Sequence, residues 1–161
     1  METYRIAELS AVAADAFVAD SNAIPTLTLR GGNALDDRAK PPPFDEVIDR
    51  LTDEYVERFH WGIPHLDAAS WRHVLPFLLA YALRNLEQAS IVVDALLSSL
   101  RPPDRQPPRL ASLSLEQEII IGQVLDVLCF SPESAYHALA CQTTEEWWEP
   151  NAMYRPRAHD A

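Results

Sequence analysis

Basic side chains are scarce in this chain. Lysine and arginine together number 13 against 24 aspartates and glutamates, which gives a net charge of −11. Proteins bind nucleic acids and anionic membranes by neutralising phosphate groups with basic side chains, so this balance argues against both classes of partner. The charge favours a basic protein as the partner, or it serves only to keep the protein in solution.

Long apolar runs are also lacking. Residues 74–83 carry no charge, but a helix that spans a bilayer needs about 20 apolar residues in succession. The first residues, 1–5, have neither the basic flank nor the apolar centre of a signal peptide. We therefore expect a protein of the cytoplasm.

Cysteine occurs only twice, at positions 129 and 141. We expect these residues on consecutive antiparallel helices joined near Ser131, with Cys129 about two residues before the turn and Cys141 about ten after it. At ~1.5 Å per residue they would differ by ~12 Å along the helix axis. A disulfide requires Cα atoms within about 7 Å, so we expect two free thiols in a reducing compartment.

The hydrophobic pattern is helical almost throughout, and only four glycines interrupt it. It predicts a single all-α domain over residues 1–150, with about five to six helices, followed by an extended tail over 151–161. Residues 26–29 alternate in polarity and indicate at most a minor extended or two-stranded element. Gly31 and Gly32 then predict a turn.

A buried central helix over 71–89 organises this domain. Residues 74–83 are apolar on every side, and a helix of that kind is surrounded by other helices. Asp67 and Ser70 are its candidate N-caps. A second strongly apolar helix, over 119–130, should pack against it, and Ser114 and Gln117 before it are predicted to form a capping box. Ser131, Pro132 and Glu133 then resemble the start of the last helix.

A third helix is predicted over 44–60, because apolar residues recur along one face of it. Asp45, Asp49 and Asp53 form a stripe on another face, which could bind a basic partner or could simply be solvated. Thr52 offers an alternative, since it could cap a separate second helix. Trp148, on the last helix, is a further candidate for a binding surface.

The densest group of potential metal ligands lies at the entry to the central helix and consists of His60, His65, Asp67 and His73. Imidazole and carboxylate groups suit zinc or iron(II). The alternative, which we favour, is that Asp67 caps the helix while the histidines bond to the backbone. His137 and Cys141, one helical turn apart, form half of a metal site or a nucleophile–base pair, but no third member is evident.

Three arginines form a basic group within the proline-rich segment that follows residue 100. Arg101, Arg105 and Arg109 could grip an anion. Alternatively, Arg101 faces a helix C-terminus and the others pair with acidic helices. The chain contains no G-x-S-x-G elbow and no phosphate-binding loop. We assign no catalytic residue and expect no cofactor or metal.

Several strings of the sequence resemble a bacterial family catalogued only as a domain of unknown function. They are W-G-I-P-H-L-D (61–67), W-R-H-V-L-P-F (71–77) and S-L-R-P-P-D-R (99–105). The resemblance implies a small bacterial cytoplasmic protein and implies no reaction, cofactor or catalytic residue.

The leading hypothesis for function is therefore a non-catalytic protein, such as an inhibitor, an immunity-type protein or an adaptor, that binds a basic protein. The alternative is a small metal-binding protein or metal-dependent enzyme that uses the histidines and aspartate of segment 60–73. Both hypotheses rest on side chains that only a structure can bring together.

Overall fold

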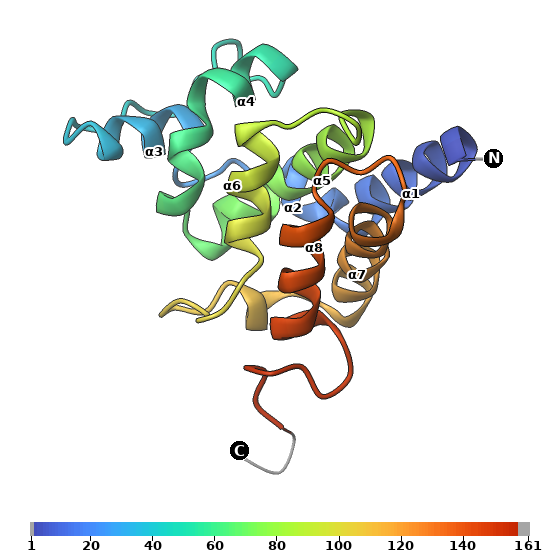
Figure 1. The fold of residues 1–161 in the computed structure, drawn as a ribbon. Coiled ribbons are helices and arrows are strands. Elements are labelled where there is room, and N and C mark those ends of the chain that lie inside the picture. The colour runs from blue at the N-terminus through green and yellow to red at the C-terminus, as the bar shows by residue number, and fades with distance from the viewer. Residues whose placement is uncertain (1, 158–161) are drawn as a thin grey trace.

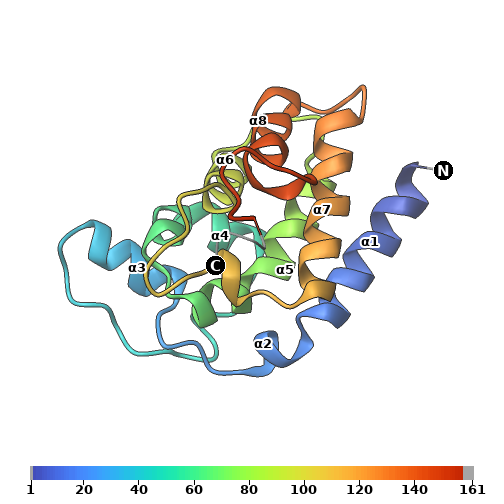
Figure 2. The same cartoon turned by 90° about the horizontal axis from the view of Figure 1, so that it is seen from below.

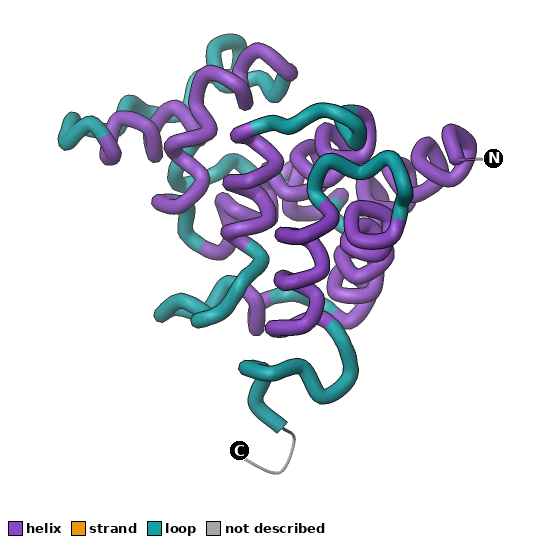
Figure 3. Tube along the Cα trace, viewed as in Figure 1, coloured by secondary structure: helices purple, strands orange, loops and turns teal. Residues whose placement is uncertain are grey.

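A computed structural model describes residues 2–157, which form helices and connecting turns without a strand in that range (Figure 3). The predicted all-α class is confirmed. The α-helices are α1 (Glu2–Ala16), α2 (Val18–Asn22), α3 (Leu29–Asp36), α4 (Asp53–Phe59), α5 (Ala68–Arg84), α6 (Ile91–Ser99), α7 (Leu115–Phe130) and α8 (His137–Thr143). Shorter helical segments are η1 (His60–His65), η2 (Leu110–Ser112) and η3 (Thr144–Trp148).

Helix α5 is the buried centre of the fold, as the sequence predicts (Figure 1). It contacts α1, α2, α6 and α7, and Figure 2 shows α1 and α7 running side by side along one flank. The Asp67 side chain caps it by accepting the backbone N–H of Ser70. The helix begins well before Pro76 and continues through it. Its core position follows from apolar side chains that cover its whole circumference.

Helix α7 is the second apolar helix of the core. It begins at Leu115, and Ser114 and Gln117 form the predicted capping box, so the helix extends a few residues before its strongly apolar part. It packs against α5 as expected.

Residues 29–36 form α3, so the prediction of a turn at Gly31 and Gly32 was wrong. The Thr28 side chain accepts the backbone N–H of Gly31 at 2.8 Å and starts the helix. Both glycines are buried, and α3 lies against η1. Glycine serves here to let two backbones approach, which the local sequence pattern could not reveal.

The predicted helix over 44–60 was also wrong, because only its second half, α4, is helical. Thr52 caps α4 by accepting the Tyr55 N–H at 3.1 Å, which is the alternative considered above. Before it, the Asp45 carboxylate accepts the N–H groups of Val47 and Ile48, each at 2.9 Å. Such side-chain bonds satisfy the backbone without a helix and hold this segment as a series of turns.

The two cysteines form a disulfide, so the expectation of free thiols was wrong. Their Cα atoms are 4.9 Å apart. Helix α8 begins at His137 and not near Ser131, which instead closes α7 by donating its N–H to Val127. Cys141 therefore lies one turn into α8 and next to the end of α7. A helix that began near Ser131 would have placed Cys141 further along its axis, away from Cys129.

The C-terminal segment folds back on the domain as far as residue 157. The N–H groups of Met153 and Tyr154 bond to the carbonyl oxygens of Glu145 and Glu146, and Arg155 forms an ion pair with Glu118. The last part of the predicted tail, residues 158–161, lies outside the described residues. None of the helices within 2–157 has the length and apolar character needed to cross a bilayer.

Candidate functional site

The aspartate stripe predicted over residues 45–53 does not form a single surface. Asp49 is only 6% exposed and binds Arg30 through two hydrogen bonds of 2.9 and 2.8 Å. The Tyr55 hydroxyl donates a third bond to it at 2.7 Å. Asp53 pairs with Arg84 at 2.9 Å, and Asp45 holds backbone amides. Each carboxylate therefore has a separate structural partner.

The environment of Asp49 favours its charged form. Burial alone would raise the pKa of this carboxyl. The hydrogen bonds from Arg30, from the Asp45 amide and from Tyr55 outweigh burial and lower the pKa below its usual value. Asp49 thus ties three segments together as an anion, which is a structural role that its place in the chain did not indicate.

The histidines and aspartate of segment 60–73 do not converge. His60 Nδ1 lies 2.8 Å from the Glu57 carbonyl oxygen, and His73 Nδ1 lies 3.0 Å from that of Asp20. His65 pairs with Asp36 at 3.0 Å, while Asp67 caps α5. Within the described part of the chain these four side chains make no group of metal ligands. The helix-capping interpretation describes them better than a metal centre.

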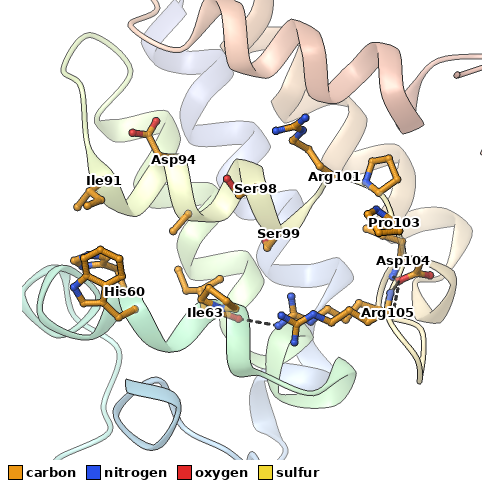
Figure 4. A pocket seen from close by; sticks show the side chains of 16 residues that line it. His60, Ile63, Ile91, Asp94, Ser98, Ser99, Arg101, Pro103, Asp104 and Arg105 are labelled. Carbon is orange, nitrogen blue, oxygen red and sulfur yellow. Dashed lines mark hydrogen bonds between the residues drawn. The ribbon is translucent and has the colours of Figure 1, made fainter. Parts of the chain in front are cut away.

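A cavity of about 430 Å³ lies between η1, α6 and the loop 101–109, and all three arginines of the basic group line it (Figure 4). They do not act together. Arg101 forms two hydrogen bonds of 2.8 Å with Glu146. Arg105 is exposed, and its guanidinium group has no partner among residues 2–157. Because Arg101 is bound to Glu146, the three guanidinium groups do not form an anion clamp.

Arg109 is buried, with 4% of its surface exposed, and it joins the loop to η1. Its guanidinium donates to the carbonyl oxygens of Ile63 at 2.7 Å and Leu66 at 2.6 Å, and it lies over the Trp71 ring at 5.7 Å. Burial lowers its pKa to about 10, so the group remains charged at neutral pH. Its Nε and Nη2 donors are occupied by the carbonyl oxygens of Ile63 in η1 and of Leu66 just after it.

Asp104 organises the same loop from within. Its carboxylate accepts four backbone N–H groups, those of Arg105 at 2.9 Å and of Arg109, Leu110 and Ala111 at 2.8 Å each. The conformation of the loop is therefore stabilised by a carboxylate that belongs to the loop itself.

Two large apolar side chains and one carboxylate are exposed at the other end of the cavity. Trp61 is 54% exposed and Ile91 is 52% exposed. Asp94 lies one turn after Ile91 on α6, and its carboxylate forms no hydrogen bond or ion pair in the described range. In Figure 4 Ile91 lies at the start of α6 on the side of the buried His60, and Asp94 projects from α6 away from His60. We call Trp61, Ile91 and Asp94 the rim corner.

The sequence did not predict the rim corner, because nothing in the local pattern indicates that the Trp61 side chain is exposed. Trp148, in contrast, was a candidate for an exposed contact, and its indole N–H donates to the Leu100 carbonyl oxygen at 2.9 Å. Its polar group is therefore committed to the interior.

One group of metal-ligand side chains does assemble, at the junction of α7 and α8. Ligand atoms of Cys129, His137 and Cys141 all lie within 4.8 Å of one another. Cys141 Sγ is 3.8 Å from His137 Nδ1, and that nitrogen also contacts the Cys129 carbonyl oxygen. The His137–Cys141 pair was visible in the sequence. Its third member was missed because α8 was predicted to begin too early.

Comparison with known proteins gives a family but no activity. No curated protein and no solved structure matches the chain significantly. A family model described as a family of unknown function, DUF6714, matches residues 5–152. This range includes the rim corner, the loop 101–109 and the cysteine–histidine group. The chain belongs to the DUF6714 family.

Proposed function

We propose that this protein is a non-catalytic binding protein for a basic protein, and that the rim corner receives a lysine or arginine side chain of that partner. The proposed setting is the bacterial cytoplasm. The observation that carries the proposal is that the exposed Trp61 ring and the Asp94 carboxylate, which forms no ion pair in the described range, line the same cavity. An aromatic face and a carboxylate together attract a cationic side chain.

The composition of the rim corner also supports a protein partner. Tryptophan is enriched among the residues that contribute most to protein–protein binding, and such residues are surrounded by contacts that exclude water. Ile91 supplies an apolar neighbour for Trp61 on the other side of the cavity mouth. The stem of a lysine or arginine is apolar and its end is charged, so it suits this combination.

The distribution of charge supports a basic partner over an acidic one. Ion pairs within the described residues join carboxylates of the same chain to arginines that include Arg30, Arg72, Arg84, Arg101 and Arg155. These pairs neutralise as many acidic groups and leave the net charge of −11 unchanged. Exposed carboxylates such as Asp94 and Glu54 form no ion pair among residues 2–157, and the field of such groups would accelerate encounter with a basic protein.

The cavity lining supports binding in preference to catalysis. His60 is the histidine of the lining, and its Nδ1 bonds to the backbone of its own turn. The hydroxyl of Ser99 donates to the Leu96 carbonyl oxygen at 2.6 Å and accepts the Trp71 N–H at 3.1 Å. In the described residues these groups serve the fold, and they do not form a nucleophile–base pair with each other.

The experiment compares proteins retained from a bacterial lysate by immobilised wild type and by two variants, Asp94→Asn and Trp61→Ala. Glu54→Gln is the matched control, because it removes one exposed negative charge from another helix. We expect the wild type and the control to retain the same basic protein, and both rim-corner variants to lose it by at least about tenfold, or 1.4 kcal/mol.

Retention should also fall with added salt, since exposed charges are screened. Equal retention by Asp94→Asn and wild type would refute the role of the rim corner. Recovery of acidic proteins alone would refute the proposed class of partner.

A further inference from the structure

We propose that Cys129, His137 and Cys141 form a zinc site in the reduced protein, and that oxidation of the two thiols to the disulfide releases the ion. In the structure the cysteines are joined, which corresponds to the oxidised state. This site is separate from the rim corner, and it uses none of the residues of segment 60–73.

The ligand set suits zinc. Two thiolates and one imidazole bind Zn²⁺ in proteins, and a fourth position then remains for water or another ligand. In a tetrahedral site with bonds of about 2.0–2.3 Å, neighbouring ligand atoms are roughly 3.3–3.8 Å apart. The distance of 3.8 Å between Cys141 Sγ and His137 Nδ1 already matches that spacing. Only the two sulfur atoms must separate, which reduction of their bond permits.

The backbone around the site favours a cation. Cys129 is the residue before the last of α7, where the carbonyl groups at the helix C-terminus create a negative potential. Its carbonyl oxygen contacts His137 Nδ1 and lies 3.6 Å from Cys141 Sγ. Because His137 Nδ1 is the nitrogen at ligand spacing, it exchanges its contact with this carbonyl oxygen for the ion, and Nε2 then carries the proton of the neutral ring.

Access to the site is one-sided. Cys129 is buried, Cys141 is half-buried and His137 is exposed. An ion or a reductant can therefore reach the group past His137, while Cys129 anchors it in the core. Helix α8 presents His137 and Cys141 on the same face, since they are four residues apart.

Reduction and oxidation of the site each transfer two electrons. A dithiol reductant transfers two electrons to the Cys129–Cys141 bond, becomes a disulfide itself and leaves two protein thiols. Zn²⁺ then binds the two sulfurs and releases both protons. In the reverse direction, hydrogen peroxide takes two electrons from the zinc-bound thiolates and the two protons that zinc binding had released to the buffer. Its O–O bond breaks to give two water molecules, the S–S bond forms and Zn²⁺ leaves.

The test is a titration of the reduced full-length protein with Co²⁺, a coloured substitute for zinc, in the absence of oxygen. We expect one equivalent to bind with the absorption of a cobalt–thiolate complex, and Zn²⁺ to displace it. Cys141→Ser should abolish that absorption. His137→Ala should weaken binding at least about tenfold, while the control His65→Ala, which removes a histidine elsewhere, should bind like the wild type.

A second measurement follows the redox step. Peroxide added to the zinc-loaded protein should release one equivalent of zinc to a chromogenic chelator, and a dithiol reductant should restore binding. Circular dichroism monitors folding of every sample. A folded reduced protein that binds no metal would overturn the proposal, as would a reduced protein that unfolds and does not regain structure with zinc. Equal binding by the His137→Ala variant, or by the oxidised protein, would also overturn it.

Discussion

Gly32 and Gly62 face each other where α3 meets η1, so closely that a Cβ atom on Gly32 would lie 2.5 Å from the Gly62 carbonyl oxygen. A Cβ atom on Gly62 would lie 2.1 Å from the carbonyl oxygen of Leu29. A backbone carbonyl group cannot move away without the rest of its segment, so the Gly62→Ala variant must separate α3 from η1. We predict that it lowers the free energy of unfolding by about 1–3 kcal/mol or more, measured with urea.

The matched control for that variant is Gly122→Ala. Gly122 lies inside α7, and a Cβ atom there would meet nothing within 4 Å. Alanine is the better helix former by roughly 0.5–1 kcal/mol, so the control should be neutral or slightly more stable. A similar loss in both variants would mean that the contact between α3 and η1 is not the cause.

The burial of α5 predicts a large difference between two alanine substitutions. The Leu79 side chain is 0% exposed, so Leu79→Ala should cost about 2–5 kcal/mol through lost contacts and a cavity. Glu54 is exposed on α4, and Glu54→Ala should change stability by no more than about 0.5 kcal/mol. Thermal and urea unfolding of the two variants measure both effects, and comparable losses would contradict the position assigned to α5.

Asp49 should make stability depend on pH in the acidic range. Its pKa is lowered in the folded state, so the folded protein holds the proton less tightly than the unfolded chain. The stability it contributes is complete above the unfolded pKa of about 3.9 and is lost as the pH falls through the folded pKa. The free energy of unfolding is measured from about pH 7 to about pH 2, the range in which carboxyl groups titrate. We predict that it falls less steeply with decreasing pH for Asp49→Asn than for the wild type.

At neutral pH the same substitution should be costly, because Arg30 and the Tyr55 hydroxyl would lose their anionic partner. Breaking a buried pair costs roughly 3–5 kcal/mol. Glu46→Gln serves as the control, since Glu46 is exposed in the same segment. If the control altered the acid dependence as much as Asp49→Asn does, Asp49 would not be its source.

Reduction of the disulfide should destabilise the metal-free protein. The bond joins residues 12 positions apart, and closing a loop of about 15 residues contributes about 3 kcal/mol by restricting the unfolded chain. Urea unfolding with and without a thiol reductant, in a chelator, should differ by about that amount. A Cys129→Ser/Cys141→Ser double variant should not respond to the reductant. A wild type that responds no more than this variant would argue against the bond.

The elements that were predicted correctly are those that short-range patterns determine. The capping box of Ser114 and Gln117, the cap at Asp67 and the apolar circumference of α5 all involve residues within one or two turns of each other. Their energies do not depend on distant segments, so the sequence displays them directly.

The errors come from interactions between distant segments. The helix expected from residue 44 fails because Asp49 bonds to Arg30, and the helix expected from Ser131 fails because Ala135 donates its N–H to the Leu86 carbonyl oxygen. The candidate sites changed for the same reason. The histidines at 60, 65 and 73 are close in sequence, yet each bonds to a different partner. The proximity of Cys129 to His137 depends on the conformation of the turn between α7 and α8, which the sequence does not reveal.

The four amide groups gathered by Asp104 have a consequence for the chemistry of the loop. Convergent backbone N–H groups are the means by which many proteins hold phosphate. Here a carboxylate already occupies them, and because it is tethered to the same chain its effective concentration is far above that of a dissolved ion. Phosphate and sulfate in the medium compete poorly against this built-in occupant, so the conformation of the loop is insensitive to the anions around it.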